Sequence, residues 1–416
     1  MKSIITSIFC LYCIFASGQQ DRIWSDRIHT LRTLVNGKWG QPSILTLGTG
    51  DYLEISFDDF THQYTRYMYK VTHCDASWKP TKGLFETDYL EGVNGELPIE
   101  NYKQSLNTTM LYTHYSFQLP NRDLKPILSG NYIVTIYEDG KEDTPVSTVC
   151  FSVVDPLMTL SASVSTNTEI DWNDSHQQVS FEIAYNGLRI FNPAQEIKTY
   201  VCQNRRSDNA VINAPFNYQT GSGLKWEHNR TLIFNAGNEY RKFEILNTHR
   251  GSMGIDKIDW FDPFYHATLI PDKPRKNYIY DEDQDGNYYI RTDEYGDNDT
   301  QSDYLFIHFR LETEARLDGD YYVNGGWSYD RFLPEYKMTY NPEERAYEAT
   351  VLLKQGYYNY QYLFVPHGSK QGLTDLIEGN FYQTENEYII YIYYSPQGSR
   401  YDQLVGFRRI RFAPNQ

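Results

Sequence analysis

The sequence predicts an all-β protein made of tandem immunoglobulin-like β-sandwich domains. Many short segments alternate apolar and polar residues with a period of two, as strands with one buried face do. Aromatic residues make up 16% of the 416-residue chain, which contains 38 tyrosines, and aromatic side chains favour strands. No window carries the 3.6-residue apolar stripe of an amphipathic helix.

The N-terminus has the pattern of a secretory signal peptide over residues 1–18. Lys2 supplies a positive charge, residues 4–16 form an apolar run, and Ala16 and Gly18 are small residues suited to a cleavage site. The apolar run is too short to span a membrane, and the most apolar later stretch, residues 388–394, has only the length of a strand. We therefore expect a mature chain that starts at Gln19, leaves the cytoplasm and has no direct membrane span.

A first β-sandwich domain is predicted over residues 19–155. Its strands are expected in a hairpin around the turn at residues 48–51 and in residues 67–71, 111–119, 132–137 and 149–153. The pair Asp155-Pro156 interrupts the alternation, because proline disfavours regular structure at the residue before it. We place the first domain boundary there.

A second β-sandwich domain is predicted over residues 156–275, and a third over residues 304–416. Strands are expected in residues 179–183, 197–201, 232–234, 243–246 and 267–270, and then in 305–311, 347–353, 358–365 and 387–394. Between the two domains, residues 281–303 contain nine acidic residues and one arginine. Such a charge run favours a solvated segment, so residues 276–303 are predicted to be an acidic linker or loop.

The composition excludes some partners and one class of disulfide-rich fold. With 38 Lys and Arg against 54 Asp and Glu, the formal net charge is −16, which repels nucleic acid. The mature chain keeps Cys74, Cys150 and Cys202, so at most one bridge can form. Buried thiols are expected, and a bridge between Cys74 and Cys150 remains open.

No motif indicates catalysis, and we expect no enzyme activity. The sequence has no GxSxG elbow, HExxH helix or Walker loop. Asp281, Asp283 and Asp285 precede Gly286 in the spacing that opens a calcium loop, but Thr292 stands where that loop needs a glutamate. A calcium-stabilised turn and a solvated acidic loop are both open, and no other cofactor is expected.

Aromatic residues in the last domain suggest an alternative function. Trp327 and the tyrosine-rich run up to Phe364 are similar to those of glycogen- and starch-binding sandwich modules. The alternative hypothesis is therefore a periplasmic or secreted carbohydrate-binding protein in which Trp327 stacks on a sugar. These aromatic side chains would equally well fill a sandwich core.

Several longer strings, in order from about residue 25 to 365, carry a resemblance to one family. They include Ser56-Phe57-Asp58-Asp59-Phe60, Tyr67-Met68-Tyr69-Lys70-Val71-Thr72-His73-Cys74-Asp75-Ala76-Ser77-Trp78, Asp88-Tyr89-Leu90-Glu91-Gly92, Tyr112-Thr113-His114-Tyr115, Gln203-Asn204-Arg205-Arg206 and Leu353-Lys354-Gln355-Gly356-Tyr357-Tyr358-Asn359-Tyr360. In these strings the sequence resembles the Plug protein family of the Bacteroidetes type IX secretion system.

The resemblance implies a periplasmic, non-enzymatic protein on the periplasmic side of the outer membrane. Such a protein binds the periplasmic mouth of the large outer-membrane β-barrel translocon and seals its pore when no cargo is exported. Candidate contacts are polar-aromatic positions in residues 85–92, 101–115 and 203–208, although each loop would equally suit internal packing. The candidates are Phe85, Tyr89, Tyr102, Tyr112, His114, Tyr115, Arg205 and Arg206.

Overall fold

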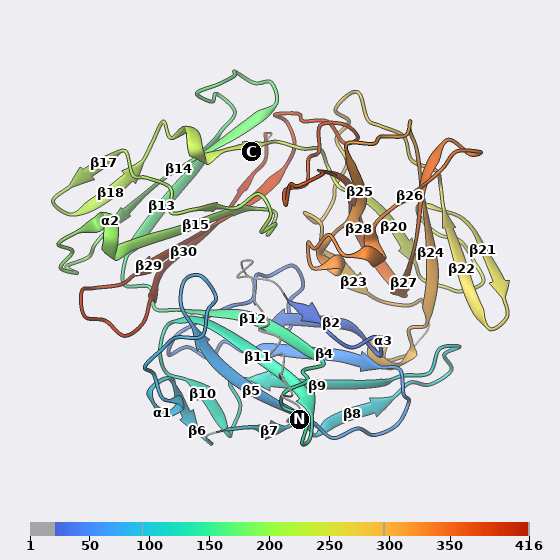
Figure 1. The fold of residues 1–416 in the computed structure, drawn as a ribbon, viewed down its shortest axis with the longest axis horizontal. Coiled ribbons are helices and arrows are strands. Elements are labelled where there is room, and N and C mark those ends of the chain that lie inside the picture. Colours follow the sequence, from blue (N-terminus) through green and yellow to red (C-terminus); the bar gives the residue numbers. More distant parts are fainter. Residues whose placement is uncertain (1–20, 94, 294–295, 415–416) are drawn as a thin grey trace, which may run out of the picture.

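The computed structural model describes residues 21–93, 95–293 and 296–414, and its regular structure is almost entirely β-strand. Three β-sandwich units surround a common centre (Figure 1). The helical segments in these ranges are single turns, and none is long and apolar enough to cross a membrane: α1 (Glu86–Tyr89), α2 (Pro193–Glu196), α3 (Asn298–Gln301), η1 (Arg230–Leu232), η2 (Gly326–Ser328) and η3 (Pro334–Tyr336). The predicted signal peptide, residues 1–18, lies outside the described residues.

The first unit comprises residues 22–154. Its strands are β1 (Arg22–Ile23), β2 (Ile28–Val35), β3 (Ile44–Thr46), β4 (Leu53–Asp59), β5 (Tyr67–Cys74), β6 (Leu90–Gly92), β7 (Leu97–Pro98), β8 (Asn101–Gln104), β9 (Thr113–Leu119), β10 (Leu124–Pro126), β11 (Gly130–Glu138) and β12 (Ser147–Val154). One sheet has the order β1-β12-β11-β5-β7 with β3 parallel to β12, the other has the order β2-β4-β9-β8, and β6 pairs with β10.

Aromatic side chains fill the core of the first unit. Phe57 stacks on Tyr115 with ring centroids 5.3 Å apart, and Tyr132 stacks on Phe151 at 5.2 Å. All four are fully buried. Large flat rings bury much apolar area from alternate positions of facing strands, which is why the period-two aromatic pattern predicts this core.

The second unit combines residues 159–235 with residues 386–412. Its strands are β13 (Thr159–Ser165), β14 (His176–Ala184), β15 (Ile197–Gln203), β16 (Val211–Ile212), β17 (Tyr218–Thr220), β18 (Gly223–Trp226), β19 (Ile233–Asn235), β29 (Asn386–Tyr394) and β30 (Gln403–Phe412). One sheet has the order β13-β14-β18-β17 with β19 beside β14, and the other has the order β16-β15-β29-β30. The buried Trp226 ring stacks on Phe181 between them.

The third unit comprises residues 241–366. Its strands are β20 (Arg241–Ile245), β21 (Ile255–Phe261), β22 (Phe264–Leu269), β23 (Tyr288–Ile290), β24 (Tyr304–Glu312), β25 (Gly319–Asn324), β26 (Thr339–Asn341), β27 (Ala346–Lys354) and β28 (Gly356–Pro366). One sheet has the order β20-β28-β23 with β25 also beside β28, and the other has the order β21-β22-β24-β27-β26.

The sheets divide the chain differently from the predicted boundaries at residues 275 and 303. β20, expected in the second domain, pairs with β28 of the third unit, and β29, expected in the third domain, pairs with β15 of the second. The third unit is therefore inserted between two parts of the second. Local alternation predicts a strand but contains no information about a partner that lies far away in the sequence.

The predicted acidic linker at residues 276–303 is largely integrated into the fold. Its strand β23 pairs with β28, and its helix α3 packs near β9 of the first unit. Asp283 and Asp303 are buried. The charge run predicts solvation, but specific backbone donors and cations satisfy several of these carboxylates inside the molecule.

Cys74, Cys150 and Cys202 are buried thiols, as expected. Cys74 lies on β5 and Cys150 on β12, with β11 between them. Strands two places apart in a sheet are separated by about 9.5 Å, which exceeds the Cα separation that a disulfide spans. The sheet order therefore keeps Cys74 and Cys150 apart.

Candidate functional site

Most of the predicted contact residues lie inside the molecule. Tyr89, Tyr112, His114, Tyr115 and Arg206 are buried, and Arg205 is half-buried at the centre. By contrast, Phe85 is 76% exposed and Tyr102 is 44% exposed. The five buried side chains therefore pack internally, which is the alternative to partner contact. Among the eight candidates only Phe85 and Tyr102 lie on the open surface.

A buried cluster of Asp58, His114, Tyr304 and Lys354, here called the Asp58 cluster, joins the first unit to the third. The Lys354 Nζ atom lies 2.6 Å from Asp58 Oδ2, and the two side chains are 2% and 1% exposed. The Tyr304 hydroxyl donates to the same oxygen at 2.6 Å, and His114 Nδ1 donates to Oδ1 at 2.7 Å. Both carboxylate oxygens therefore have charged or polar partners.

Strand register brings these four side chains together. Asp58 on β4 is the direct cross-strand partner of His114 on β9, and Tyr304 on β24 is the direct partner of Lys354 on β27. Each pair thus comes from one sheet, and the two pairs face each other across the interface. The sequence strings at 56–60, 112–115 and 353–360 supply three of the four residues.

Electrostatics make the Asp58 cluster sensitive to the loss of any member. Burial alone would raise the pKa of Asp58, but Lys354 and the hydrogen bond from His114 hold it at about 2. Burial lowers the pKa of Lys354, and the charge of Asp58 acts against that shift. Because the folded pKa of Asp58 is depressed, its stabilisation is present above pH 4 and is lost as pH falls toward 2.

Further contacts extend this interface. The ring of Tyr112 lies 4.1 Å from Lys354 Nζ, and its hydroxyl donates to the carbonyl of Ser302 at 2.8 Å. Arg32 pairs with Asp299 at 2.8 Å.

The carboxylate of Asp303 accepts the backbone N–H groups of Thr109 at 2.7 Å and Met110 at 3.1 Å. Thr109, Met110 and Tyr112, which belong to the candidate contact segment at residues 101–115, therefore contact the third unit.

Arg205 connects all three units. From the end of the β15 segment in the second unit, its guanidinium pairs with Glu387 at 3.2 Å. It also donates to the carbonyl of Gly40 in the first unit at 2.5 Å and to Asn287 of the third unit at 2.9 Å. The rigid fork of an arginine suits this role, because its donors diverge in one plane.

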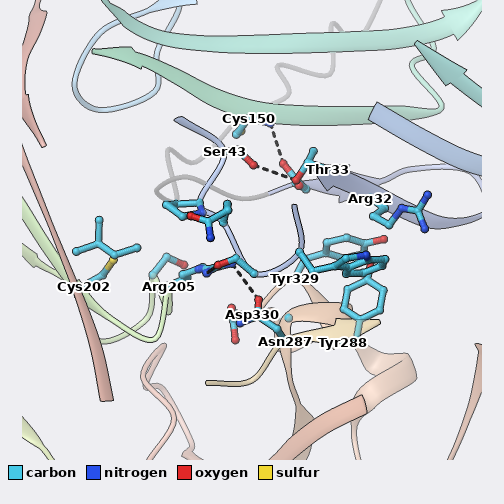
Figure 2. Close-up of a pocket in the computed structure, with 18 of the residues that line it drawn as sticks. Arg32, Thr33, Ser43, Cys150, Cys202, Arg205, Asn287, Tyr288, Tyr329 and Asp330 are labelled. Atoms are coloured by element: carbon cyan, nitrogen blue, oxygen red, sulfur yellow. Dashed lines mark hydrogen bonds between the residues drawn. The ribbon is translucent and has the colours of Figure 1, made fainter. Parts of the chain in front are cut away.

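A central cavity of about 170 Å³ lies beside Arg205 (Figure 2). Thr33 and Ser43 line it from the first unit, Cys202 from the second, and Asp330 from the third. Burial raises the pKa of Asp330 to about 7, and the charge of Arg206 acts in the opposite direction. The cavity lies where the three units meet, and its lining mixes polar with apolar and aromatic side chains.

The first and second units are joined by polar contacts of their own. The Tyr393 hydroxyl on β29 donates to Asn131 Oδ1 on β11 at 2.9 Å. Asp402 accepts the backbone N–H of Ala76 at 2.9 Å and pairs with Lys198 at 2.8 Å. Each pair of units is therefore held by buried or partly buried directional contacts.

The three calcium candidates have separate partners. Asp281 pairs with Lys242 at 2.6 Å, whereas Asp283 accepts backbone N–H groups from Tyr240 and Asp285. Asp285 lies 3.8 Å from Arg411. Across residues 21–93, 95–293 and 296–414, no group of three or more His, Cys, Asp or Glu side chains is placed to hold a metal ion. Calcium binding stays a prediction.

Burial leaves two acidic groups near this turn with raised pKa values. Burial raises the pKa of Glu239 to about 7, although the Tyr278 hydroxyl donates to its carboxyl group at 2.6 Å. Burial and the charge of Asp285 raise the pKa of Asp283 to about 8. Both groups favour their protonated forms in the folded chain.

Trp327 is a core residue. It is buried, its Nε1 atom donates to the carbonyl of Asn359 at 2.9 Å, and its ring stacks near Phe309 with centroids 6.0 Å apart. The expectation that Trp327 offers an exposed stacking platform for a sugar is wrong, because η2 turns its indole into the third unit.

Three strongly exposed aromatic side chains are not among the candidates predicted from the sequence. Trp172, Phe191 and Phe261 are 75%, 84% and 59% exposed. Phe261 lies at the tip of the β21–β22 hairpin, where Asp262-Pro263 separates two strands. An aromatic residue beside an Asp-Pro turn is a detectable signal, because turn residues lie at the surface.

We predict that Asp58→Asn destabilises the protein by about 3–5 kcal/mol, because it leaves the Lys354 ammonium buried without its counter-charge. Urea unfolding at pH 7 measures the change. The double variant Asp58→Asn with Lys354→Met should recover much of the loss, since no uncompensated charge remains. A double variant as unstable as the sum of the single variants would contradict the coupling.

The raised pKa values of Glu239 and Asp283 predict a fall in stability between about pH 5 and 8. In that window the unfolded carboxyl groups are ionised while the folded ones still hold protons, so raising the pH favours unfolding. Each such group contributes a slope of up to about 1.4 kcal/mol per pH unit. The urea midpoint at pH 5, 6.5 and 8 measures this dependence.

Glu239→Gln should reduce that slope, because glutamine keeps the hydrogen-bond acceptor for Tyr278 and does not titrate. Glu282→Gln, which removes an exposed carboxyl group of the nearby loop, is the matched control and should leave the slope unchanged. A wild-type midpoint that stays constant or rises from pH 5 to 8 would show that these groups ionise normally in the folded state.

Comparisons with known proteins agree with the arrangement of the units. A crystal structure of a hypothetical protein from Parabacteroides merdae ATCC 43184 is 42% identical, with a TM-score of 0.92, and the match covers 95% of this chain and 100% of that chain. No curated protein matches. Residues 28–155, which span almost all of the first unit, match the family described as the type 9 secretion system plug protein first domain. The chain belongs to the plug protein family of the type IX secretion system.

Proposed function

We propose that this protein binds the periplasmic mouth of the large outer-membrane β-barrel translocon and seals its pore when no cargo is exported. Membership of the plug family gives it a role in type IX secretion and an association with the secretion machinery in the cell envelope. The proposal adds the periplasmic location, the barrel as the partner and the closing of the pore. It assigns the protein a binding role without catalysis.

The observation that carries this proposal is the joining of three units into one body. A seal has to keep its shape against an opening, so its parts must not separate easily. Here the Asp58 cluster, Arg205 and the Tyr393–Asn131 contact join the units pairwise. Removing one partner of a buried ion pair costs about 3–5 kcal/mol, which opposes any motion that would pull the units apart.

The exposed end of the first unit supplies a suitable docking surface. Tyr102 on β8 packs against Tyr64 with ring centroids 4.7 Å apart, and the two side chains are 44% and 54% exposed. Tyrosines offer large contact area with few rotatable bonds, and their hydroxyl groups remain solvated in the free protein. Such a surface suits an interface that forms and is released.

We predict that affinity purification of the full-length protein from native membranes recovers a barrel of large mass. Tyr64→Ala combined with Tyr102→Ala should lower that recovery about tenfold, in the range of strong interface residues. Tyr218→Ala, which removes an equally exposed tyrosine of the second unit, is the control. Unchanged recovery would reject this docking surface, whereas recovery of the protein alone under gentle detergents would reject the barrel as the partner.

We further predict that deletion of the gene makes the outer membrane permeable to large antibiotics while secretion continues. An unsealed translocon would leave an aqueous opening, so the minimal inhibitory concentration of an antibiotic normally excluded by size should fall. Plasmid-borne wild-type protein should restore resistance. Unchanged permeability in the deletion strain would contradict a sealing role even if the protein binds the barrel.

A further inference from the structure

A second surface, separate from the Tyr64–Tyr102 patch, has the features of a peptide-binding cleft. It is a cavity of about 490 Å³ between residues 22–30 of the first unit and the third unit. Its walls include the side chains of Trp24, Phe306, Leu333 and Leu352. A cavity of this size with apolar and aromatic walls is within the range of ligand-binding sites.

One charged side chain in this cleft has no partner. The half-buried Arg331 guanidinium makes no hydrogen bond and no ion pair within the described residues. Buried arginines elsewhere are paired: Arg206 with Asp208 at 2.7 Å and Arg241 with Asp272 at 2.6 Å. Burial lowers the pKa of Arg331, whereas the paired carboxylates raise the pKa of Arg206 and of Arg241.

An unpaired guanidinium that is partly removed from water favours an anionic ligand. Planar, bidentate hydrogen bonding matches a carboxylate, and such charge-assisted bonds are stronger than bonds between neutral groups. Glu335 on the rim is exposed and exerts a favourable charge on Arg331 without forming an ion pair. A carboxylate that enters the cleft would therefore find a cation with open donor sites.

The cleft continues into a stripe of half-buried aromatic side chains on the outer face of β21–β22–β24, which ends at the exposed Phe261. Phe306 lines the cleft, and its ring stacks on His266 with centroids 5.0 Å apart. The ring of His266 also packs against the rings of His308 and Phe261, each with centroids 5.1 Å apart. The ring centroids of Phe264 and Phe306 lie 5.5 Å apart. Register places His266 directly beside Phe306, so these side chains share one face.

The shape of this surface suits an extended chain better than a compact molecule. From β27 to β21 the stripe crosses four adjacent strands, or about 14 Å at about 4.8 Å per strand, which is the length of about four extended residues. At one end lies Arg331, and at the other lies the exposed Phe261 at the hairpin tip. Figure 1 shows this hairpin at the outer edge of the third unit.

We propose that the cleft and the stripe together bind an extended segment of a partner protein in which bulky apolar side chains precede a carboxylate. The apolar side chains pack on Phe306, His266 and Phe264, and the carboxylate pairs with Arg331. This site does not depend on the docking surface assigned above, because it lies on the third unit and has its own chemistry.

The test measures binding of a labelled heptapeptide to the full mature chain by fluorescence anisotropy. In the peptide three phenylalanines alternate with three serines, and glutamate is the last residue. The C-terminus of the peptide is amidated, so that the glutamate side chain supplies its only carboxylate. The same peptide with glutamine as the last residue is the comparison. The wild type should bind the glutamate peptide at least tenfold more tightly than the glutamine peptide. Equal affinities, or no saturable binding of either peptide, would overturn the proposal.

Two variants separate the contributions. Arg331→Gln should abolish the preference for glutamate while still binding both peptides, and Phe264→Ser should weaken both peptides alike. Arg122→Gln, at an exposed arginine of the first unit, is the control and should behave as wild type. Retention of the glutamate preference in a folded Arg331→Gln protein, verified by circular dichroism, would overturn the assignment of Arg331; unaltered binding by Phe264→Ser would overturn the stripe.

Discussion

The arrangement of the molecule depends on the buried ion pair between Asp58 and Lys354. Each charge alone would destabilise the fold at that depth, because only its attraction to the other charge offsets the free-energy cost of removing it from water. The pair forms only when β4 and β9 of the first unit and β24 and β27 of the third are each in register and in contact. One interaction thus couples the local accuracy of two sheets to the orientation of two units, and Arg205 extends the coupling to the second unit.

The same constraint explains the tyrosine content. Several buried or half-buried tyrosines direct the hydroxyl at a polar group of a neighbouring unit. The hydroxyl of Tyr112 donates to the carbonyl of Ser302, that of Tyr329 to the carbonyl of Leu31, and that of Tyr393 to the Asn131 side chain. A tyrosine fills apolar space like phenylalanine and also satisfies a polar group at its far end. It is therefore suited to the seams between sandwiches, where apolar cores meet the polar edges of sheets.

Part of this structure could be predicted from the sequence. Alternation and aromatic content predict the all-β class, and the first boundary at residue 155 lies directly after β12. The boundaries at 275 and 303 could not be predicted, since pairing such as that of Tyr200 with Tyr391 joins residues far apart in the sequence. Tyr112 resembles a surface residue because its polar partner Ser302 lies in another unit, and His114 does so because the third unit covers its pair with Asp58. Trp327 resembles a glycan platform because its burial depends on a turn. Arg331 carries no sequence signal, since only the fold shows that no carboxylate of the described residues forms an ion pair with it.

The central claim is that the three units act as one rigid body at the pore of a secretion translocon. The most direct measurement is a cryo-electron microscopy reconstruction of the barrel complex isolated from the cell envelope. We predict density across the periplasmic mouth into which the three units fit together, with the Asp58–Lys354 interface intact and no rearrangement between units. Density that requires the units to be separated, or that lies away from the pore, would contradict it.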